Sequence, residues 1–285
     1  MMKIYNVGRY RHDGRIVVGR PNGSQVDVLC ETDDLPWALG ECDASTPAIA
    51  SIPAAAATLL PPLDAASRVF AIAVNYRAHG AEAKTQPPVR PLVFYKPPSN
   101  FVAPGAALRV NRDLVTRLDY EGEIGLVIGR SCKDATVADA LDYVAGVCAL
   151  NDGSARNLGR VGLGSQPGAA TWPDWTAAKG IDGGSALGPT ISCGPEVVQA
   201  LRHRSLRIRT RLNGEVVQDG GMSEMIFSCE EIISTLSSYM VLQPGDVIGT
   251  GTPAGVGMAR NRFLEHGDRL EVQVGEFESL FVTVE

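Results

Sequence analysis

Three acidic residues are spaced along the chain so that they could bind a metal ion together. Glu121 and Glu123 lie two residues apart just before a dense apolar run, and Asp152 follows a second apolar run at 144–150. In a strand, positions i and i+2 share a face, so the two glutamates repel one another unless a positive charge lies between them. Carboxylate oxygens at the ends of buried strands are ligands that Mg²⁺ and Mn²⁺ prefer. The same pattern also allows a solvated acidic face.

A histidine and a glutamate are spaced for acid–base chemistry. His79 and Glu82 lie three residues apart, which makes them neighbours on a helical turn. A carboxylate beside an imidazole orients the ring and raises its basicity, as a general base requires. An exposed ion pair is the alternative reading. The polar, proline-containing segment 85–90 follows, and such a segment could fold over a site and exclude water.

Lysines and a glycine-rich loop supply further candidates. Lys179 could stabilise a developing oxyanion if it lies near the carboxylates, although most lysines are on the surface. Lys96 ends an apolar run, and the sequence leaves it open as a substrate or a structural contact. In the segment Thr250-Gly251-Thr252, small residues would let a ligand carboxylate approach the backbone N–H groups and threonine hydroxyls, or would simply form a tight turn.

Alternating apolar patterns and turn signals predict the elements that must position these residues. We expect strands at 68–74, 91–97, 119–129 and 144–150, and an amphipathic helix at 134–145. Asn22-Gly23 and Asn213-Gly214 predict hairpins, and a capping box at Ser228 opens a helix that runs to Met240. Arginines 207, 209 and 211 alternate with other residues, as on the solvated face of an edge strand.

The change in composition near residue 65 predicts two domains. Residues 1–65 contain short strands, a short helix within 45–66 and a connector rich in proline and alanine. We interpret them as a small β-rich N-terminal domain that packs against a catalytic domain at 66–285. The long polar segment between Asp152 and Lys179 contains two tryptophans, and irregular segments of that length are often functional.

The whole-chain composition excludes several classes of function. A net charge of −6 disfavours nucleic-acid binding, because phosphates require an excess of cations. The six cysteines show no C-x-x-C spacing, and the start of the chain lacks an apolar signal segment, so they are expected to be reduced thiols. No segment has the length and hydropathy of a membrane span. We therefore expect a cytoplasmic protein that binds neither membranes nor nucleic acids.

Taken in order, these motifs resemble the fumarylacetoacetate hydrolase family from about Val69 to the C-terminus. The motifs that carry the resemblance are Asn75-Tyr76 with His79 and Glu82, Phe94-Tyr95-Lys96-Pro97, Asp119-Tyr120-Glu121-Gly122-Glu123, Asn151-Asp152, Ser154-Ala155-Arg156, Lys179 with Asp182, Leu187-Gly188-Pro189, Asn213-Gly214-Glu215, Pro244-Gly245-Asp246, and the run from Thr250 to Gly257. The small N-terminal domain is similar to that of many bacterial members.

The resemblance implies a fold, a cofactor and a set of roles. The fold would be α+β, mostly β, a mixed β-sandwich roll that forms a homodimer. Mg²⁺ or Mn²⁺ would be held by Glu121, Glu123 and Asp152, and would bind a small 2-oxo acid. Lys179 would stabilise an enolate, and the His79–Glu82 pair would activate water, as in the acylpyruvase-like branch. The matched motifs assign substrate binding to Tyr76, Arg156, Asp182, Thr250, Gly251 and Thr252.

Three departures from the family pattern concern the substrate pocket. Gly153 replaces a larger apolar residue, Asn157 and Gly159 replace an aspartate and a glutamine, and the segment 182–185 lacks an aromatic residue. We expect hydrolysis of a C–C bond in an acylpyruvate or a related 2,4-dioxo acid, in the degradation of aromatic or similar carbon sources. The alternatives are an oxaloacetate decarboxylase, an isomerase of an unsaturated 2-oxo diacid, and a non-catalytic protein that binds a divalent metal.

Overall fold

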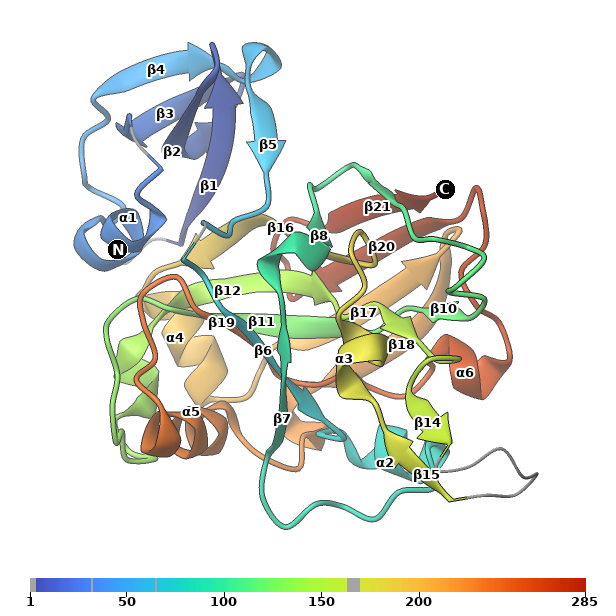
Figure 1. Ribbon diagram of the computed structural model, residues 1–285. Helices are drawn as coiled ribbons and strands as arrows, with labels where there is room; N and C mark the ends of the chain where they lie inside the picture. The colour runs from blue at the N-terminus through green and yellow to red at the C-terminus, as the bar shows by residue number, and fades with distance from the viewer. Residues whose placement is uncertain (1–3, 32, 65, 163–169) are drawn as a thin grey trace.

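The protein is mostly β, with short helices packed around two sheets. The computed structural model describes residues 4–31, 33–64, 66–162 and 170–285. A large mixed sheet forms the centre of the molecule, and a five-stranded sheet packs against one of its faces (Figure 1). The strands β1–β5, coloured blue, stand at one end of the large sheet. The mostly β class is the one that the sequence predicted.

The large sheet has the strand order β4-β3-β2-β1-β16-β12-β11-β19-β6-β7, with β5 paired to β1 and β8 paired to β16. Most neighbours are antiparallel, whereas β19 and β6 are parallel. Its strands are β1 (Tyr5–His12), β2 (Arg15–Asn22), β3 (Gln25–Cys30), β4 (Ala50–Pro53), β5 (Thr58–Leu60), β6 (Val69–Ala73), β7 (Leu92–Lys96), β8 (Phe101–Val102), β11 (Gly122–Ile128), β12 (Val144–Asn151), β16 (Ser185–Cys193) and β19 (Val247–Gly249).

The remaining strands form the second sheet and two small ribbons. The five-stranded sheet has the order β18-β17-β20-β21-β9, and the ribbons pair β10 with β13 and β14 with β15. These strands are β9 (Ala107–Leu108), β10 (Leu118–Asp119), β13 (Ser154–Ala155), β14 (Arg160–Gly162), β15 (Thr171–Pro173), β17 (Arg207–Leu212), β18 (Glu215–Gly221), β20 (Arg269–Val274) and β21 (Leu280–Val284). The long segment before Lys179 therefore contains strand β13 and the ribbon of β14 and β15, and its residues 163–169 lie outside the described part of the chain.

Strand β11 is buried on both faces, and its alternation decides where the acidic residues point. Ile124, Leu126 and Ile128 belong to the main core, which includes apolar residues of β17, β20 and β21. Val127, on the opposite face, packs in a second cluster with residues of β1 and of helix α1 (Leu35–Glu41). Side chains two residues apart share a face, so the odd-numbered Glu121 and Glu123 point away from the five-stranded sheet.

The other helices are short. They are α2 (Arg77–Glu82), α3 (Trp175–Lys179), α4 (Pro195–Arg202), α5 (Cys229–Tyr239) and α6 (Gly257–Arg260), with 3₁₀ turns η1 (Ala54–Ala56), η2 (Pro98–Asn100), η3 (Ala140–Tyr143) and η4 (Met222–Glu224). Helix α5 begins with the predicted capping box, in which Ser228 and Glu231 bond each other's backbone N–H groups. None of the described helices has the length and apolar character needed to cross a membrane.

Several local predictions are confirmed. The expected strands appear as β6, β7, β11 and β12, and the two Asn-Gly dipeptides connect β2 to β3 and β17 to β18. Helix α2 carries His79 and Glu82, as their spacing indicated.

Two predicted helices are wrong. Residues 134–143 contain only the 3₁₀ turn η3, residues 144–145 belong to strand β12, and Val137, expected on the buried face, is 51% exposed. Asp134 is at φ +53°, which is not helical, and the backbone N–H groups of Asp134 and Ala135 donate to Ser237 of helix α5 at 3.0 and 3.1 Å. The helix expected within 45–66 is the 3₁₀ turn η1 between strands β4 and β5.

The arginine-rich strand is not at an edge. Strand β17 pairs with both β18 and β20, so it lies inside the five-stranded sheet. Its arginines occupy the outer face and bond acidic residues of the neighbouring strands, Asp219 and Glu271. The alternation correctly indicated an outward face. It could not indicate the pairing of the strand, because edge and interior strands of a one-sided sheet share this pattern.

Candidate metal centre and active site

Pairing between β11 and β12 brings the three acidic residues together. Asn151, at the end of β12, accepts from the backbone N–H of Glu121 through Oδ1 at 3.1 Å. The backbone N–H of Asp152 donates to the carbonyl oxygen of Glu121 at 2.8 Å. The carboxylates of Glu121, Glu123 and Asp152 are all buried, and one ligand atom from each lies within 4.8 Å of the others. The predicted convergence of these side chains therefore occurs.

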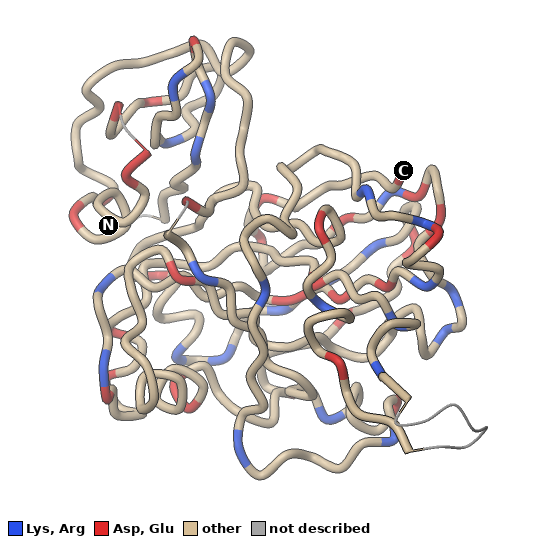
Figure 2. The backbone as a smooth tube through the Cα atoms, viewed as in Figure 1, with Lys and Arg blue, Asp and Glu red and all other residues tan. Residues whose placement is uncertain are grey.

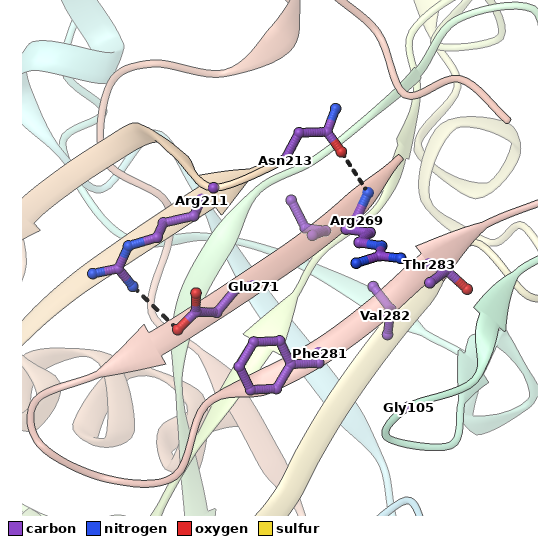
Figure 3. Close-up of a pocket in the computed structure, with 10 residues that line it drawn as sticks. Gly105, Arg211, Asn213, Arg269, Glu271, Phe281, Val282 and Thr283 are labelled. Carbon is purple, nitrogen blue, oxygen red and sulfur yellow. Dashed lines mark hydrogen bonds and ion pairs between the residues drawn. The ribbon is translucent and has the colours of Figure 1, made fainter. Parts of the chain in front are cut away.

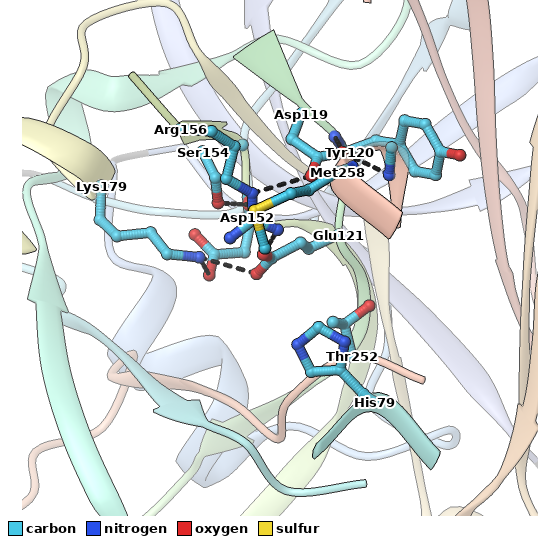
Figure 4. Close-up of polar contacts among 12 residues, drawn as sticks. His79, Asp119, Tyr120, Glu121, Asp152, Ser154, Arg156, Lys179, Thr252 and Met258 are labelled. Atoms are coloured by element: carbon cyan, nitrogen blue, oxygen red, sulfur yellow. Dashed lines mark hydrogen bonds and ion pairs between the residues drawn. The ribbon is translucent and has the colours of Figure 1, made fainter. Parts of the chain in front are cut away.

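Three cationic side chains contact these carboxylates, and Figure 4 shows two of them, Lys179 and Arg156. Lys179 Nζ lies 2.7 Å from Glu121 Oε2 and 2.5 Å from Asp152 Oδ2, and Lys96 Nζ lies 2.7 Å from Asp152 Oδ1. Arg156 pairs with Glu121 through Nη2 and with Asp119 through Nε, the latter at 2.8 Å. Both lysines are buried, which excludes a surface role for Lys179.

The surroundings of Glu121 and Glu123 shift the pKa values of the two carboxyl groups in opposite directions. Burial alone would raise the pKa of Glu121, but Arg156 and Lys179 lower it well below its ordinary value. Burial, Asp152 and Glu121 raise the pKa of Glu123 well above its ordinary value. Glu123 accepts one hydrogen bond, at 3.1 Å from the backbone N–H of Gly251. Glu123 therefore favours its protonated, neutral form, and a further positive charge beside it would stabilise the ionised form.

The arrangement fits a divalent metal ion. All three donors are carboxylate oxygens, each with lone pairs left over after the contacts described above. The raised pKa of Glu123 is the effect expected where carboxylates share a buried site without enough positive charge. A hard oxygen set of this kind suits Mg²⁺ or Mn²⁺ rather than a metal that prefers thiolate or imidazole ligands.

The His79–Glu82 pair faces the same region from helix α2. His79 Nδ1 lies 3.4 Å from Glu82 Oε2, at the long end of a hydrogen bond. The backbone N–H of Gly255 donates to both carboxylate oxygens of Glu82, at 3.0 and 3.2 Å. His79 is 8% exposed, so the pair is not the solvated surface contact that the sequence left open. Glu82 is anchored by the backbone and can hold the imidazole in place.

The glycine-rich loop, Thr250-Gly251-Thr252, forms hydrogen bonds with Glu123 and with the start of β11. Gly251, at φ +90°, has no space for a side chain beside Asn75, and its N–H holds Glu123. Thr252 Oγ1 donates to the carbonyl oxygen of Gly122 at 2.8 Å, and it accepts from Gln218 at 2.7 Å. The loop is thus bonded to the start of β11.

A small cavity of about 130 Å³ lies beside these residues, and Asp152 and Glu82 reach it only through the lining residues that they contact. Of the predicted site residues, His79, Glu121, Glu123, Arg156, Lys179 and Thr252 line it. Figure 4 shows Lys179 reaching the carboxylates from one side, with His79 and Thr252 on another. The apolar part of the lining comprises Ile72, Ala73, Val74, Ala83, Phe94, Trp175 and Met258.

Other predicted substrate residues lie outside this lining. Tyr76 is fully buried in the main core, Thr250 is fully buried, and Asp182 is exposed and accepts from Ser99 Oγ at 3.0 Å. Their assignment to substrate binding stays a prediction, as does the role of Gly251, which reaches Glu123 only through its backbone.

Three residues without a predicted role help to build the site. Asp119 accepts from the backbone N–H groups of Gly257 and Met258 as well as from Arg156. Asn75 bonds Phe227 and the carbonyl oxygen of Thr250, which ties the end of β6 to the glycine-rich loop. Lys96 also donates to the carbonyl oxygens of Gly153 and Lys179, at 3.1 and 2.6 Å. The sequence signal for Lys96 was a lysine at the end of an apolar strand.

A larger hollow of about 540 Å³ lies on the outer face of the five-stranded sheet (Figure 3). Its polar side chains bond one another or the backbone: Arg211 Nη1 donates to Glu271 Oε1 at 3.1 Å, and Asn213 Oδ1 accepts from the backbone N–H of Arg269. It contains neither the carboxylate cluster nor the His79–Glu82 pair. Charged residues elsewhere are spread along the chain with both signs intermixed (Figure 2). The smaller cavity is therefore the candidate site.

Two of the departures in the sequence have structural explanations. A Cβ at Gly153 would lie 1.7 Å from the carbonyl oxygen of Gly184, so no larger residue fits there. Asn157 Oδ1 accepts from the backbone N–H groups of Thr116 and Arg117, both at 3.2 Å, and its Nδ2 donates to the carbonyl oxygen of Leu114. An amide serves both functions, whereas an aspartate could not donate.

Comparisons with known proteins found relatives both by sequence and by structure. A family model described as fumarylacetoacetate (FAA) hydrolase C-terminal matches residues 68–285. Oxaloacetate tautomerase YisK of Bacillus subtilis is 34% identical over 216 residues, which are 74% of this chain and 67% of that protein.

Two solved structures cover nearly the whole chain. Fumarylacetoacetate hydrolase from Exiguobacterium antarcticum has a TM-score of 0.80 and 28% identity, and covers 99% of both chains. The 5-carboxymethyl-2-hydroxymuconate delta-isomerase of Mycobacterium smegmatis has a TM-score of 0.77 and 30% identity, and covers 98% of both chains. These likenesses confirm the predicted fold.

Proposed function

The chain belongs to the fumarylacetoacetate hydrolase family, and on that premise we propose that it hydrolyses a C–C bond in an acylpyruvate or a related 2,4-dioxo acid. One observation carries the proposal. His79, held by Glu82, lines the same small cavity as Glu121, Glu123 and Lys179. Hydrolysis needs a base for water and stabilisation for a leaving enolate, and the cavity offers candidates for both.

The carboxylates of Glu121, Glu123 and Asp152 would hold Mg²⁺ or Mn²⁺. A bound divalent ion supplies Lewis-acid polarisation of the substrate's 2-oxo group. The chain's own contribution is to fix these ligands: Lys96 and Lys179 hold Asp152, Arg156 holds Glu121, and the Gly251 N–H holds Glu123. Ligands that are already oriented by outer contacts do not have to reorganise when the ion binds.

His79 and Glu82 would activate the water. With Nδ1 directed at Glu82, the imidazole presents Nε2 as the base. Nε2 takes a proton from water while the water oxygen attacks the carbonyl carbon distal to the 2-oxo acid. The bond between that carbon and C3 then breaks, and its electron pair becomes the pyruvate enolate. Transfer of the proton from Nε2 to C3 regenerates the imidazole and completes the products, pyruvate and a carboxylic acid.

Lys179 would stabilise the enolate. Its ammonium group is fixed between Glu121 and Asp152 and lies 4.9 Å from the centroid of the Phe94 ring. Burial would lower the pKa of Lys179, but Asp152 and Glu121 raise it above its ordinary value, so the group stays charged. A fixed cation in a buried site is effective against developing negative charge.

Isomerisation or tautomerisation is the second candidate, favoured by the similarity to an oxaloacetate tautomerase and to a delta-isomerase. Isomerisation and tautomerisation need only a base that moves a proton between carbon and oxygen. Decarboxylation of oxaloacetate, the other alternative that the sequence left open, does not require His79. A non-catalytic metal protein would tolerate the loss of both His79 and Lys179.

The test is turnover of acetylpyruvate and oxaloacetate with Mg²⁺, with and without EDTA. We expect EDTA-sensitive cleavage of acetylpyruvate, lowered about 10²–10⁴-fold in His79→Gln, with unchanged Mg²⁺ binding. His266→Gln, an exposed histidine outside the cavity, is the matched control. Turnover of oxaloacetate alone, insensitive to His79→Gln, would exclude the hydrolase in favour of the decarboxylase. Proton exchange at C3 without cleavage would favour the tautomerase.

A further inference from the structure

The backbone of Gly122 is where the five-stranded sheet reaches the strand that carries the glutamates. Gly122 lies between Glu121 and Glu123, so it faces the five-stranded sheet while the two carboxylates face away. A Cβ on Gly122 would lie 2.1 Å from Thr210 Oγ1 and 3.3 Å from Gln218 Oε1. Thr210 and Gln218 are buried cross-strand partners on β17 and β18. Side chains of the second sheet therefore contact the backbone between two metal-ligand candidates.

The side-chain amide of Gln218 forms three hydrogen bonds at this contact. Its Oε1 accepts from the backbone N–H of Gly122 at 2.9 Å. Its Nε2 donates to Thr252 Oγ1 at 2.7 Å and to the carbonyl oxygen of Pro253 at 2.9 Å. A backbone N–H only donates and a carbonyl oxygen only accepts, so these two groups fix which way the amide points. Gln218 is 1% exposed, so bulk water does not replace these bonds if the amide is lost.

These bonds close a ring between strand β11 and the glycine-rich loop. Gly122 donates to Gln218, Gln218 donates to Thr252, and Thr252 donates back to the carbonyl oxygen of Gly122 at 2.8 Å. Gly251, the residue before Thr252, holds Glu123 through its backbone N–H. The loop that holds Glu123 is therefore bonded, through Gln218, to the strand that carries Glu123.

Strand β18 also supports the chain that follows the loop. Pairing between β19 and β11 ends at Gly249, so the residues beyond the loop need other partners. Gly255, at φ +106°, packs so closely on β18 that a Cβ would lie 1.9 Å from the carbonyl oxygen of Val217. Its N–H holds both carboxylate oxygens of Glu82, the partner of His79. One strand therefore positions a segment that holds a metal-ligand candidate at one end and the His79–Glu82 pair at the other.

We propose that Gln218 is a positioning residue for the metal centre and for the base. The inference rests on the proposed function, which assigns Mg²⁺ to the carboxylates and the role of the base to His79. Gln218 acts by fixing the segment 251–255 against the start of β11. Loss of the amide would leave the Gly122 N–H and the Pro253 carbonyl oxygen without these partners, and the segment and the strand could then shift relative to one another.

The test is the substitution Gln218→Met, which keeps a similar side-chain length and removes all three bonds. We expect Gln218→Met to bind Mg²⁺ about tenfold more weakly by calorimetry, at the lower end of the loss typical when groups behind metal ligands are removed. Hydrogen exchange should become faster at the Gly122 N–H and in the segment 251–255. An unchanged Mg²⁺ affinity in the folded variant, or no Mg²⁺ binding by the native protein, would overturn the inference.

Two substitutions on strand β17 control for a purely structural effect. Thr210 Oγ1 has no hydrogen-bond partner among the described residues, so Thr210→Val changes the same contact without breaking a bond. Ile208 is fully buried in the main core, and Ile208→Ala should lower the thermal midpoint. We expect both variants to keep the native Mg²⁺ affinity. A loss in either one as great as in Gln218→Met would show that Gln218 is structural only.

Thr252 offers a second test that does not require Gln218→Met to fold. Thr252→Val removes the hydroxyl that closes the ring, whereas Thr252→Ser keeps a hydroxyl there. We expect Mg²⁺ binding to be several-fold weaker in Thr252→Val and close to native in Thr252→Ser. Adding Thr252→Val to Gln218→Met should cause little further loss, because both changes open the same ring. Equal Mg²⁺ affinities in Thr252→Val and Thr252→Ser would contradict the inference.

The Mg²⁺ measurements separate this inference from the proposed reaction. If Gln218→Met loses Mg²⁺ affinity but the native protein does not cleave acetylpyruvate, the hydrolase proposal is wrong and the role of Gln218 at the metal centre stands. If acetylpyruvate is cleaved but Gln218→Met keeps the native Mg²⁺ affinity, the hydrolase proposal stands and the role of Gln218 is wrong.

The effect on the base is measured at saturating Mg²⁺, where the weaker metal binding no longer contributes. With acetylpyruvate as the substrate, we expect Gln218→Met to lower kcat with KM nearly unchanged, because a displaced His79–Glu82 pair slows the reaction of bound substrate. A native kcat under these conditions would overturn the part of the inference that concerns the base.

Discussion

At the scale of single residues, Glu121 and Glu123 illustrate how position changes the chemistry of one side-chain type. They lie two apart on one face, yet the pKa of Glu121 is lowered and that of Glu123 is raised. The difference arises because Arg156 and Lys179 both contact Glu121, whereas Glu123 accepts one backbone N–H and lies beside two other acids. Binding of a metal ion would therefore be coupled to loss of a proton from Glu123.

The first prediction concerns the pH dependence of stability in chelator. A carboxyl whose pKa is raised in the folded state holds a proton that the unfolded chain releases near 4.5. The stability that this proton contributes is present below that pH and is lost as the pH rises toward the folded-state pKa. We expect the thermal midpoint with EDTA to fall from pH 5 upward, and to fall less in Glu123→Gln.

Mg²⁺ should remove most of this pH dependence in the native protein but not in Glu123→Gln, because the ion replaces the proton. Glu41→Gln, an exposed acid at the end of α1, serves as the control and should follow the native protein. Identical pH profiles for the native protein and Glu123→Gln would contradict the assignment.

The second prediction concerns Lys96. Its buried ammonium group contacts Asp152 and the carbonyl oxygens of Gly153 and Lys179, so Lys96→Met would leave a buried carboxylate short of a partner. Breaking a buried pair in this way costs about 3–5 kcal/mol of unfolding free energy. Denaturant unfolding measures the effect, and the partly exposed Lys133→Met is the control. A loss below about 1 kcal/mol would show that the pair is not important for stability.

At the scale of elements, strand alternation and close backbone contacts position the site. The double burial of β11 places the glutamates on the face opposite the five-stranded sheet, and β12 delivers Asp152 beside them. Helix α2 and the glycine-rich loop are connected through Glu82 and Gly255. Each chemical group therefore depends on a different element, and small displacements of one element affect the whole site.

The third prediction concerns Gly153, which follows a metal-ligand candidate and touches the loop that contains Gly184. A Cβ there would meet a backbone oxygen at 1.7 Å, so Gly153→Ala must move one of the two segments. Overpacking of this kind costs about 1–3 kcal/mol, occasionally more. We expect that loss of unfolding free energy together with weaker Mg²⁺ binding by calorimetry.

Gly159→Ala is the matched control for Gly153→Ala. A Cβ at Gly159 would lie 3.6 Å from Ala178 Cβ, an ordinary contact, so this change should leave metal binding and stability close to native. Equal effects of the two substitutions would show that glycine flexibility, rather than the close approach to Gly184, is what matters.

At the scale of the whole molecule, the N-terminal strands are joined to the large sheet. Strand β1 pairs with β16 from Tyr5 to Val7, and residues of β1, β2 and α1 share a core cluster with Leu187 and Ile191 of β16. Segments on both sides of the predicted boundary at residue 65 thus contribute to this cluster, while Tyr10, Val17, Val26 and Val28 form a separate cluster within the N-terminal strands. The homodimer and the cytoplasmic location stay predictions, and light scattering tests the first.

The fourth prediction concerns a fragment that contains residues 66–285. Removing residues 1–65 would expose apolar residues of that shared cluster and leave the β16 edge unpaired where β1 binds. Exposed apolar patches and strand edges favour aggregation. We expect the fragment to melt at a lower temperature than the full chain and to aggregate, as measured by circular dichroism and light scattering. A monodisperse fragment with the native melting temperature would show that residues 66–285 are independent.

The sequence by itself determined the strands β6, β7, β11 and β12, the two Asn-Gly hairpins, the capped helix α5 and the identity of the carboxylate cluster. These depend on local signals: alternation, turn residues and a capping box are each written within a few positions. The helix expected at 134–145 is wrong: Asp134 has a positive φ, and the backbone N–H groups of Asp134 and Ala135 bond Ser237 of helix α5, a distant contact that the local pattern does not indicate.

Only the tertiary structure decided what the cluster contacts. The burial of Lys96 and Lys179, the pairing of Arg156 with both Asp119 and Glu121, and the interior position of β17 depend on residues far apart in sequence. The requirement for glycine at 153 comes from a backbone oxygen 31 positions away. Such contacts depend on which strands pair with one another and on the paths of the connecting loops. A pattern of a few neighbouring residues does not specify the strand pairing.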